Sequence, residues 1–206
     1  MVELFISTLV TFFVIIDPIG CAPIFAGLTA GATHAQRNAM AVRAVAVAAI
    51  ILVVFALVGE QLLHGLGIGL PSFRIAGGIM LFLIALEMVF EKRTQRREDR
   101  AQKLIETPEV EDVSIFPMAM PMIAGPGSIA SVMLLMSQNS GFERSAAILV
   151  AMGLILLLTL AALMLAGPLM RLMGTKIEAV ITRLLGVLLS ALAIQFVIDG
   201  IRESLA

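Results

Sequence analysis

Two proline-containing stretches decide the fold of this chain, Asp17-Pro18-Ile19-Gly20-Cys21-Ala22-Pro23 and Pro121-Met122-Ile123-Ala124-Gly125-Pro126-Gly127-Ser128. Both interrupt long apolar segments, and each contains two prolines five residues apart. They lie at matching points of the two halves of the chain. Hydrophobic segments broken at corresponding positions of two halves are the best sequence pointer to the binding site of a membrane transporter.

The composition indicates a membrane protein. Hydrophobic residues make up 60% of the 206 residues, with a mean hydropathy of +1.04, whereas soluble domains are roughly 45–50% apolar. Charged residues are 14% of the chain, and many of them lie between Glu91 and Asp112. The net charge of −1 gives no indication of nucleic-acid binding, and a single cysteine excludes an internal disulfide and a multi-cysteine metal site.

Six segments are long and apolar enough to cross a bilayer, which takes about 20 residues per helix. Backbone groups in lipid must be satisfied within the segment, so these spans are expected to be helices. The first span has Glu3 where a signal peptide would carry Lys or Arg, and it is interpreted as a retained helix. The predicted spans are residues 2–27, 43–64, 73–90, 114–136, 145–170 and 180–200.

A polar linker, residues 91–113, divides one membrane domain into a repeat of residues 1–90 and a repeat of residues 114–206. Each repeat has three spans, so the second must be inverted relative to the first. The expected fold is all-α and polytopic, with six transmembrane helices in two inverted three-helix repeats and with broken first and fourth helices. Chance similarity between apolar segments is the alternative. The matching positions are Pro18 with Pro121, Pro23 with Pro126, and Arg74-Ile75-Ala76-Gly77 with Arg183-Leu184-Leu185-Gly186.

The distribution of arginine and lysine predicts the orientation, because cytoplasmic loops are enriched in both. With six spans, three basic residues fall on one side of the membrane, namely Arg74, Arg144 and Arg202. Eleven fall on the other side, namely Arg37, Arg43, Lys92, Arg93, Arg96, Arg97, Arg100, Lys103, Arg171, Lys176 and Arg183. Both termini are therefore expected outside, which is the periplasm for a bacterial inner membrane, and the linker in the cytoplasm.

Asp17 is the most informative charged residue. It lies some sixteen residues into the first span, well inside the hydrocarbon at about 1.5 Å per residue. An ionised carboxylate at such a depth costs roughly 2.5–3.5 kcal/mol and is retained where it faces a cavity or a partner. Asp17 is therefore a predicted proton carrier or cation ligand. The alternative is an N-cap for a second half-helix with Pro18 at its first position, and the two roles are compatible.

The other residues of the two interruptions are predicted to free backbone groups toward a substrate. The prolines remove donors, the glycines permit turns, and the N–H groups of Gly127, Ser128 and Ile129 are a candidate seat for a carboxylate. A simple structural kink is the alternative at each break. Thr8, Thr11, Ser131, Thr159 and Gln195 are weaker candidates, because such side chains usually bond their own helix or a neighbour. The predicted substrate- or ion-binding residues are Asp17, Pro18, Gly20, Cys21, Pro23, Pro121, Gly125, Pro126, Gly127 and Ser128.

These motifs resemble the MarC family of small integral membrane proteins, which includes small neutral amino acid transporters. The resemblance is carried by Asp17-Pro18-Ile19-Gly20, by Pro23-Ile24-Phe25, and by the stretch from Pro117 to Ile129. It implies an inner-membrane protein of two three-helix repeats and, for some members, uptake or export of small neutral amino acids. Cys21 stands where family members often carry Asn, which puts a polar contact from this side chain in doubt.

The sequence thus predicts a secondary transporter of small neutral solutes, in particular amino acids, coupled to protons or sodium. Its partners are the bilayer and the solute, and it requires no cofactor, metal or nucleic acid. No motif of an enzyme is present, neither G-x-S-x-G nor a phosphate-binding loop nor a His-Glu metal motif. The alternative is a non-transporting membrane protein that assembles with or regulates a partner, since Gly27 and Gly31 permit close helix packing.

Overall fold

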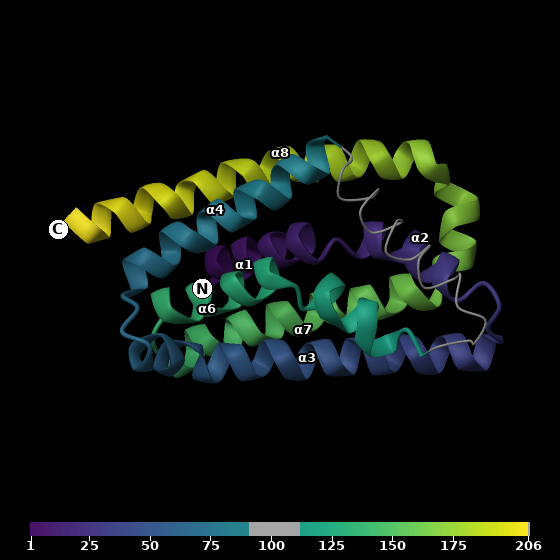
Figure 1. Cartoon of the computed structure of the whole chain (residues 1–206), viewed down its shortest axis with the longest axis horizontal. Helices are drawn as coiled ribbons and strands as arrows, with labels where there is room; N and C mark the ends of the chain where they lie inside the picture. Colours follow the sequence, from purple (N-terminus) through teal and green to yellow (C-terminus); the bar gives the residue numbers. More distant parts are fainter. Residues whose placement is uncertain (91–111, 206) are drawn as a thin grey trace.

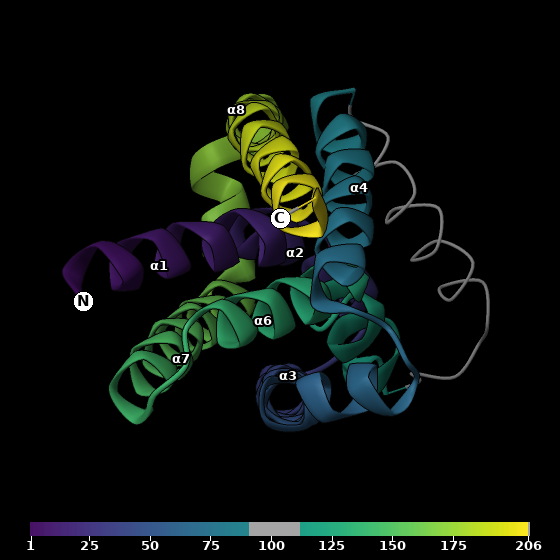
Figure 2. The ribbon, with the colours of Figure 1, turned by 90° about the vertical axis from the view of Figure 1, so that its left-hand side faces the viewer.

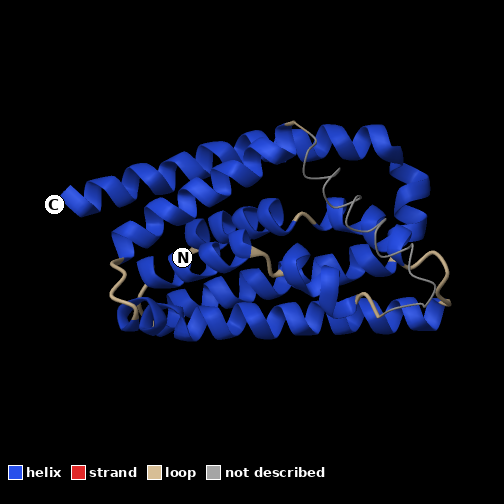
Figure 3. Cartoon of the chain, viewed as in Figure 1, coloured by secondary structure: helices blue, strands red, loops and turns tan. Residues whose placement is uncertain are grey.

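The computed structural model describes residues 1–90 and 112–205, and every regular element in these two ranges is a helix (Figures 1 and 3). Five helical spans there are long and apolar enough to cross a membrane, or six if the bent pair Ser114–Ile123 and Pro126–Gln138 forms one span. The prediction of an all-helical membrane protein is therefore confirmed. The predicted charged linker lies outside the described residues, apart from Asp112 and Val113.

The helices follow the predicted spans in order, but several bounds differ. The first span, Val2–Leu28, consists of two helices, and the last apolar span, Ala179–Leu205, is the second part of a longer helix. That long helix first crosses the end of the bundle and then bends back along it (Figure 1). The elements are α1 (Val2–Ile16), α2 (Pro18–Leu28), α3 (His34–Gly65), α4 (Leu70–Val89), η1 (Ser114–Ile123), α6 (Pro126–Gln138), α7 (Phe142–Met164) and α8 (Ala166–Leu205).

Helix α3 begins at His34 rather than at the predicted residue 43, because a capping box starts it early. The Gln36 N–H donates to Thr33 Oγ1 at 3.3 Å, and the Thr33 N–H donates to Gln36 Oε1 at 2.9 Å. This reciprocal pair satisfies two donors that a helix start leaves open. The apolar pattern alone could not place this boundary, since the first turns of α3 are polar.

The long helices enclose the short ones. Helix α4 lies along α8, and α3 contacts α7 (Figures 1 and 2). Helices α1 and α2 pack on α7, whereas η1 and α6 pack on α3. Helix α6 is buried on nearly all sides, from Gly127 to Leu135. The two interruptions are thus held in the middle of the bundle.

Glycines bring α4 and α8 into backbone contact. A Cβ atom added to Gly78 would lie 2.8 Å from the Ala193 carbonyl oxygen, and one added to Gly186 would lie 3.0 Å from the Ala85 oxygen. Small residues at helix interfaces allow such close approach in membranes. The tight pair forms one wall behind the start of α6.

Candidate functional site

The first interruption is a sharp break at one residue. Asp17 has φ 55° and ψ 67°, a left-handed conformation that ends α1 at Ile16. Its N–H donates to the Phe13 oxygen at 3.0 Å, and its Oδ1 accepts from the Gly20 N–H at 3.0 Å. Asp17 is the N-cap of α2 with Pro18 at the first helical position, so the predicted cap is confirmed. The carboxylate is only 1% exposed.

The residues after Asp17 complete this cap. A Cβ atom on Gly20 would overlap the Asp17 carboxylate, so only glycine leaves room for it. Cys21 is buried, and its Sγ donates to the Ile16 oxygen at 3.4 Å. A polar contact from this position is therefore present. Helix α2 continues through Pro23 to Leu28, so Pro23 does not end it.

The second interruption is longer than predicted. The sequence predicts a helical span over 114–136 that breaks only at 121–128, whereas η1 is irregular from its first residues. Phe116 (φ −126°, ψ 126°) and Met120 (φ −132°, ψ 125°) are extended, and each precedes a proline. Proline clashes with a helical residue before it, which explains both extended residues. The axes of η1 and α6 are bent by 52°.

Helix α6 starts without a side-chain cap within the described residues. Gly125 is its N-cap in an extended conformation, Pro126 is the first helical residue, and a Cβ atom on Gly125 would overlap the Pro121 oxygen. The Ile129 N–H donates to the Gly125 oxygen at 3.0 Å. The predicted carboxylate seat is therefore wrong for Ile129, and only the N–H groups of Gly127 and Ser128 remain.

One feature is shared by both breaks. Ser128 Oγ donates to the oxygen of Ile123, the last residue of η1, at 2.8 Å, as Cys21 Sγ does to the last residue of α1. Each side chain thus satisfies a carbonyl that the break leaves without its helical donor. Side chains from the second half-helix therefore hold the first half-helix in place.

The two interruptions meet in the structure. A Cβ atom on Gly127 would lie 3.4 Å from Ile15 Cγ2, 3.3 Å from Leu81 Cδ2 and 2.8 Å from Ile84 Cδ1. The end of α1 and the start of α6 therefore touch, with α4 behind them. Helices α2 and α6 begin near this point and run toward opposite ends of the molecule (Figure 1).

The predicted site residues are not equally close to this meeting point. Seven of them are buried, namely Asp17, Pro18, Gly20, Cys21, Gly125, Gly127 and Ser128. Pro23 and Pro121 are half-buried, and Pro126 is exposed. These three prolines constrain the backbone but are less buried than the other seven residues. Binding by any of the ten residues stays a prediction.

Comparison with known proteins identifies the family. A sequence model described as "MarC family integral membrane protein" matches residues 2–205. The chain is a member of the MarC family. This MarC protein is 36% identical to a UPF0056 membrane protein of Methanocaldococcus jannaschii over 98% of both chains. It is 34% identical to the UPF0056 membrane protein YhcE of Escherichia coli, over 92% of this chain and 88% of the relative.

A third relative of the MarC chain is the UPF0056 membrane protein YvbG of Bacillus subtilis, with 31% identity over 98% of this chain and 96% of the relative. These names describe membrane proteins and state no cargo. No solved structure matches the chain. The site of this MarC protein therefore has to be interpreted from its own residues.

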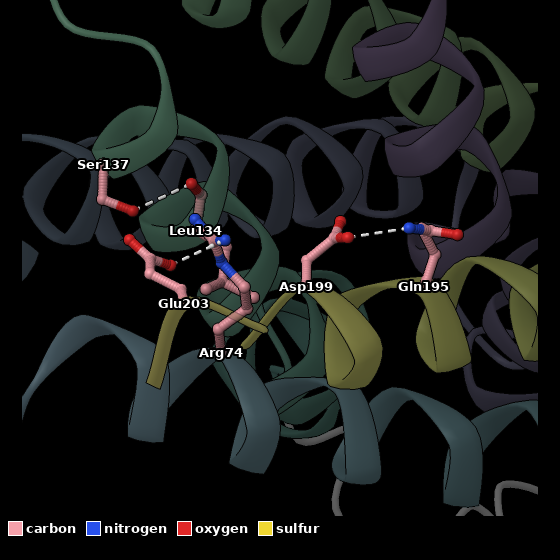
Figure 4. Close-up of polar contacts among 6 residues, drawn as sticks. All are labelled: Arg74, Leu134, Ser137, Gln195, Asp199 and Glu203. Atoms are coloured by element: carbon pink, nitrogen blue, oxygen red, sulfur yellow. Dashed lines mark hydrogen bonds and ion pairs between the residues drawn. The ribbon is translucent and has the colours of Figure 1, made fainter. Parts of the chain in front are cut away.

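A polar cluster joins the start of α4 to the end of α8 in this MarC protein (Figure 4). Arg74 of α4 pairs with Glu203 of α8, with Nη1 and Oε2 2.8 Å apart. One helical turn before Glu203, Asp199 Oδ1 accepts from Gln195 Nε2 at 2.8 Å. Gln195, a weaker candidate in the sequence, thus bonds within α8. The cluster ties the ends of α4 and α8 together.

Two of the weaker candidates, Thr8 and Ser131, do not bond their own helix as expected. Within the described part of the chain, five buried side-chain polar atoms have no hydrogen-bond partner: Thr8 Oγ1, Arg37 Nε, Ser114 Oγ, Ser131 Oγ and Thr182 Oγ1. Thr8 and Ser131 lie on α1 and α6, the two helices that meet at the break. The only signal in the sequence was their membership of those two broken spans.

Proposed function

We propose that this MarC protein is a secondary transporter of small neutral solutes, in particular amino acids, and that it catalyses no reaction. The observation that carries the proposal is the contact between two buried breaks at Ile15 and Gly127. Irregular backbone at membrane depth is tolerated where protein encloses it or where it lines a cavity. Discontinuous helices that meet in this way form the substrate and ion sites of many transporters.

The chemistry of the two half-helix starts suits a zwitterion. The start of α2 is neutralised by its own cap, the Asp17 carboxylate, whereas no side chain caps the start of α6 in the described residues. A helix N-terminus carries a partial positive charge and binds anions through its N–H groups. The N–H groups of Gly127 and Ser128 would receive the carboxylate of an amino acid, and Asp17 would hold a proton, a sodium ion or the ammonium group.

The walls of the site favour a small neutral side chain. Ile15, Leu81 and Ile84 surround Gly127 closely enough that even one added methyl group would touch all three. These neighbours are apolar, so a charged side chain would find no partner among them. Glycine, alanine and serine, whose side chains are small and uncharged, are therefore the proposed cargo class.

We also propose that the two halves are inverted repeats. Two contacts between α4 and α8 support this arrangement: Gly78 approaches Ala193 and Val197, and Gly186 approaches Ala85 and Val89. Gly186, Ala193 and Val197 lie 108 positions after Gly78, Ala85 and Val89, respectively. The contacts that Gly78 makes with the second half are therefore the same as those that Gly186 makes with the first half. A two-fold relation between the repeats predicts such an exchange.

The helix starts fit the same shift. Pro18 and Pro126 both occupy the first helical position after a break, and they too are 108 positions apart. The sequence match of Pro18 with Pro121 therefore pairs residues at different places in the fold, since Pro121 lies before the second break. The exchanged packing of α1 and α2 on α7, and of η1 and α6 on α3, also supports the repeat.

We propose that both termini face the periplasm in an inner membrane. The two chain ends and the α3–α4 and α6–α7 connections lie at one end of the molecule (Figure 1). That end carries Arg74, Arg144 and Arg202 and is the side of the membrane with three of the fourteen basic residues. By the positive-inside rule, the opposite side, which has the other eleven basic residues, is the cytoplasmic one.

The test is transport by the purified protein in liposomes. Radiolabelled glycine, alanine and serine are offered under an imposed proton or sodium gradient, with protein-free liposomes as the control. We expect accumulation driven by one of the two gradients, and loss of that gradient dependence in Asp17→Asn. If folded protein carries no amino acid under either gradient, transport is wrong, and the alternative of a partner-binding membrane protein is favoured.

A further inference from the structure

Thr8 and Ser131 break the pattern that the other buried hydroxyls follow. Thr29 Oγ1 donates to the Phe25 oxygen at 2.7 Å, and Thr159 Oγ1 donates to the Ile155 oxygen at 2.8 Å, each four residues back in the same helix or span. Thr8 and Ser131 are 0% exposed, yet their hydroxyls make no hydrogen bond in the described chain. Both lie inside regular helices, where this bond to the preceding turn is available to Ser and Thr.

Both residues lie on the facing sides of α1 and α6. Thr8 is seven residues before Ile15, close to two helical turns, and Ser131 is four residues after Gly127, about one turn, so each shares a face with the residue that makes the contact. Ile15 and Gly127 touch across the two helices. Helix α1 approaches the break and α6 leaves it toward the same end of the molecule (Figures 1 and 2). Thr8 and Ser131 therefore follow one interface outward from the break.

The other faces of α6 are already occupied. Ala130 and Leu134 pack against Gly77 of α4, since a Cβ atom there would lie 3.6 Å from Ala130 Cβ and 3.1 Å from Leu134 Cδ1. Met133 packs against Gly59 of α3. The remaining neighbours of α6 are α1 and α7, and Ser131 shares the face on which Gly127 meets Ile15 of α1. Thr11 of α1 is one turn before Ile15, is 2% exposed and extends the same hydroxyl face.

We propose that the α1–α6 interface is a hydroxyl-lined polar path, which leads from the meeting point of the two breaks toward the end that carries the N-terminus. Thr8 and Ser131 are its lining residues, and Thr11 lies about level with Ser131, one turn from the contact. Buried hydroxyls without protein partners require water or a polar solute as partner, because an unmet buried donor is costly. The path takes water and small solutes with hydrogen-bonding groups. Its assignment to amino acids rests on the proposed function.

Cysteine accessibility tests the path directly. Cys21 is the sole cysteine, so Cys21→Ser gives a thiol-free background. In this background Thr8→Cys, Thr11→Cys and Ser131→Cys are placed in lipid nanodiscs, where both faces meet solution, and a positively charged, membrane-impermeant methanethiosulfonate reagent is added. Ala130→Cys is the matched control at the depth of Ser131 but facing α4. Leu157→Cys, 62% exposed on α7, is the control for a residue on the lipid-facing surface.

We expect the path cysteines to react at least tenfold faster than both controls. The path would be overturned if Ser131→Cys and the folded α1 variants reacted no faster than Ala130→Cys. Because three positions are tested, the result stays decisive if one variant misfolds. Flux assays on the wild-type protein separate the two proposals. Labelling without amino acid flux would support the path and refute transport, whereas flux without labelling would support transport and overturn the path.

Discussion

Replacing Asp17 separates the structural role of this residue from its charge. Asp17→Asn keeps a side-chain oxygen for the Gly20 N–H, and Asn is among the residues that tolerate the left-handed conformation seen at φ 55°. Asp17→Ala removes the cap and forces alanine into that conformation. The two variants therefore differ in backbone support but share the loss of the carboxylate.

The expected magnitudes follow from these contacts. Loss of an N-cap costs about 1 kcal/mol, and a left-handed alanine costs roughly 1–2 kcal/mol, so Asp17→Ala should lose about 2–3 kcal/mol. For a chain of this size that corresponds to a melting temperature lower by roughly 4–12 °C. Asp17→Asn loses only the charge at the start of α2, about 0.3–1 kcal/mol. An amide costs no more to bury than a carboxyl group, so Asp17→Asn should be about as stable as the wild type.

The measurement uses the single cysteine as a reporter. The protein has no Trp or Tyr, so thermal unfolding in detergent is followed with a fluorogenic maleimide that reacts with Cys21 once this buried thiol becomes exposed. Glu60→Ala, at an exposed helix position, is the control for a lost carboxylate and should melt within about 2 °C of the wild type. Equal melting of Asp17→Ala and the wild type would refute the cap reasoning. If Asp17→Asn melted as low as Asp17→Ala, the charge rather than the cap would be the stabilising feature.

Three further predictions concern contacts within the helix bundle, and each is measured by the same thermal assay. Gly125→Ala should destabilise the protein by about 3 kcal/mol, since its Cβ would overlap a backbone oxygen of η1. Its control, Gly153→Ala, adds a methyl group in open space and should stabilise the protein by up to about 1 kcal/mol. Equal shifts in melting temperature for the two variants would contradict this. Gly78→Ala and Gly186→Ala should each destabilise the protein by about 1–3 kcal/mol, and by similar amounts if the halves are repeats. If one of the two variants were neutral and the other were not, this would argue against the repeat. Arg74→Gln should cost only about 0.5–1 kcal/mol, because its partner Glu203 is 44% exposed; a loss above about 3 kcal/mol would show a more buried pair.

The first break could be predicted from the sequence because local rules decide it. An Asp before a Pro is a good helix start, and the structure has Asp17 as N-cap with Pro18 at the first position. The position of the Asp17 carboxylate, folded back over the first turn of α2, also explains Gly20, since the side chain of any larger residue there would displace it. Here the identities of four consecutive residues determine the backbone.

The second break could be located but not described from sequence. The prolines of residues 121–128 predicted an interruption, yet Phe116 and Met120 are also extended because each precedes a proline, so the irregular stretch begins earlier than expected. The register between the halves stays a prediction. Proline spacing favoured Pro18 with Pro121, whereas the contacts of Gly78 and Gly186 favour a shift of 108 residues. Contacts between distant helices decide that register, and spacing within one segment cannot show them.

The two breaks differ in how the second half-helix begins, and the proposed function rests on this difference. Helix α2 begins on a residue that supplies its own anion, while α6 begins on Gly125, which has no side chain to supply one. Two identical uncapped starts would gather two positive ends at one point and would favour an anion. One capped and one uncapped start instead place a carboxylate near a free helix N-terminus, with Ile15 and Gly127 in contact between them. The proposed cargo, a neutral amino acid, carries both charges and no net charge in water, and such a pair would suit it.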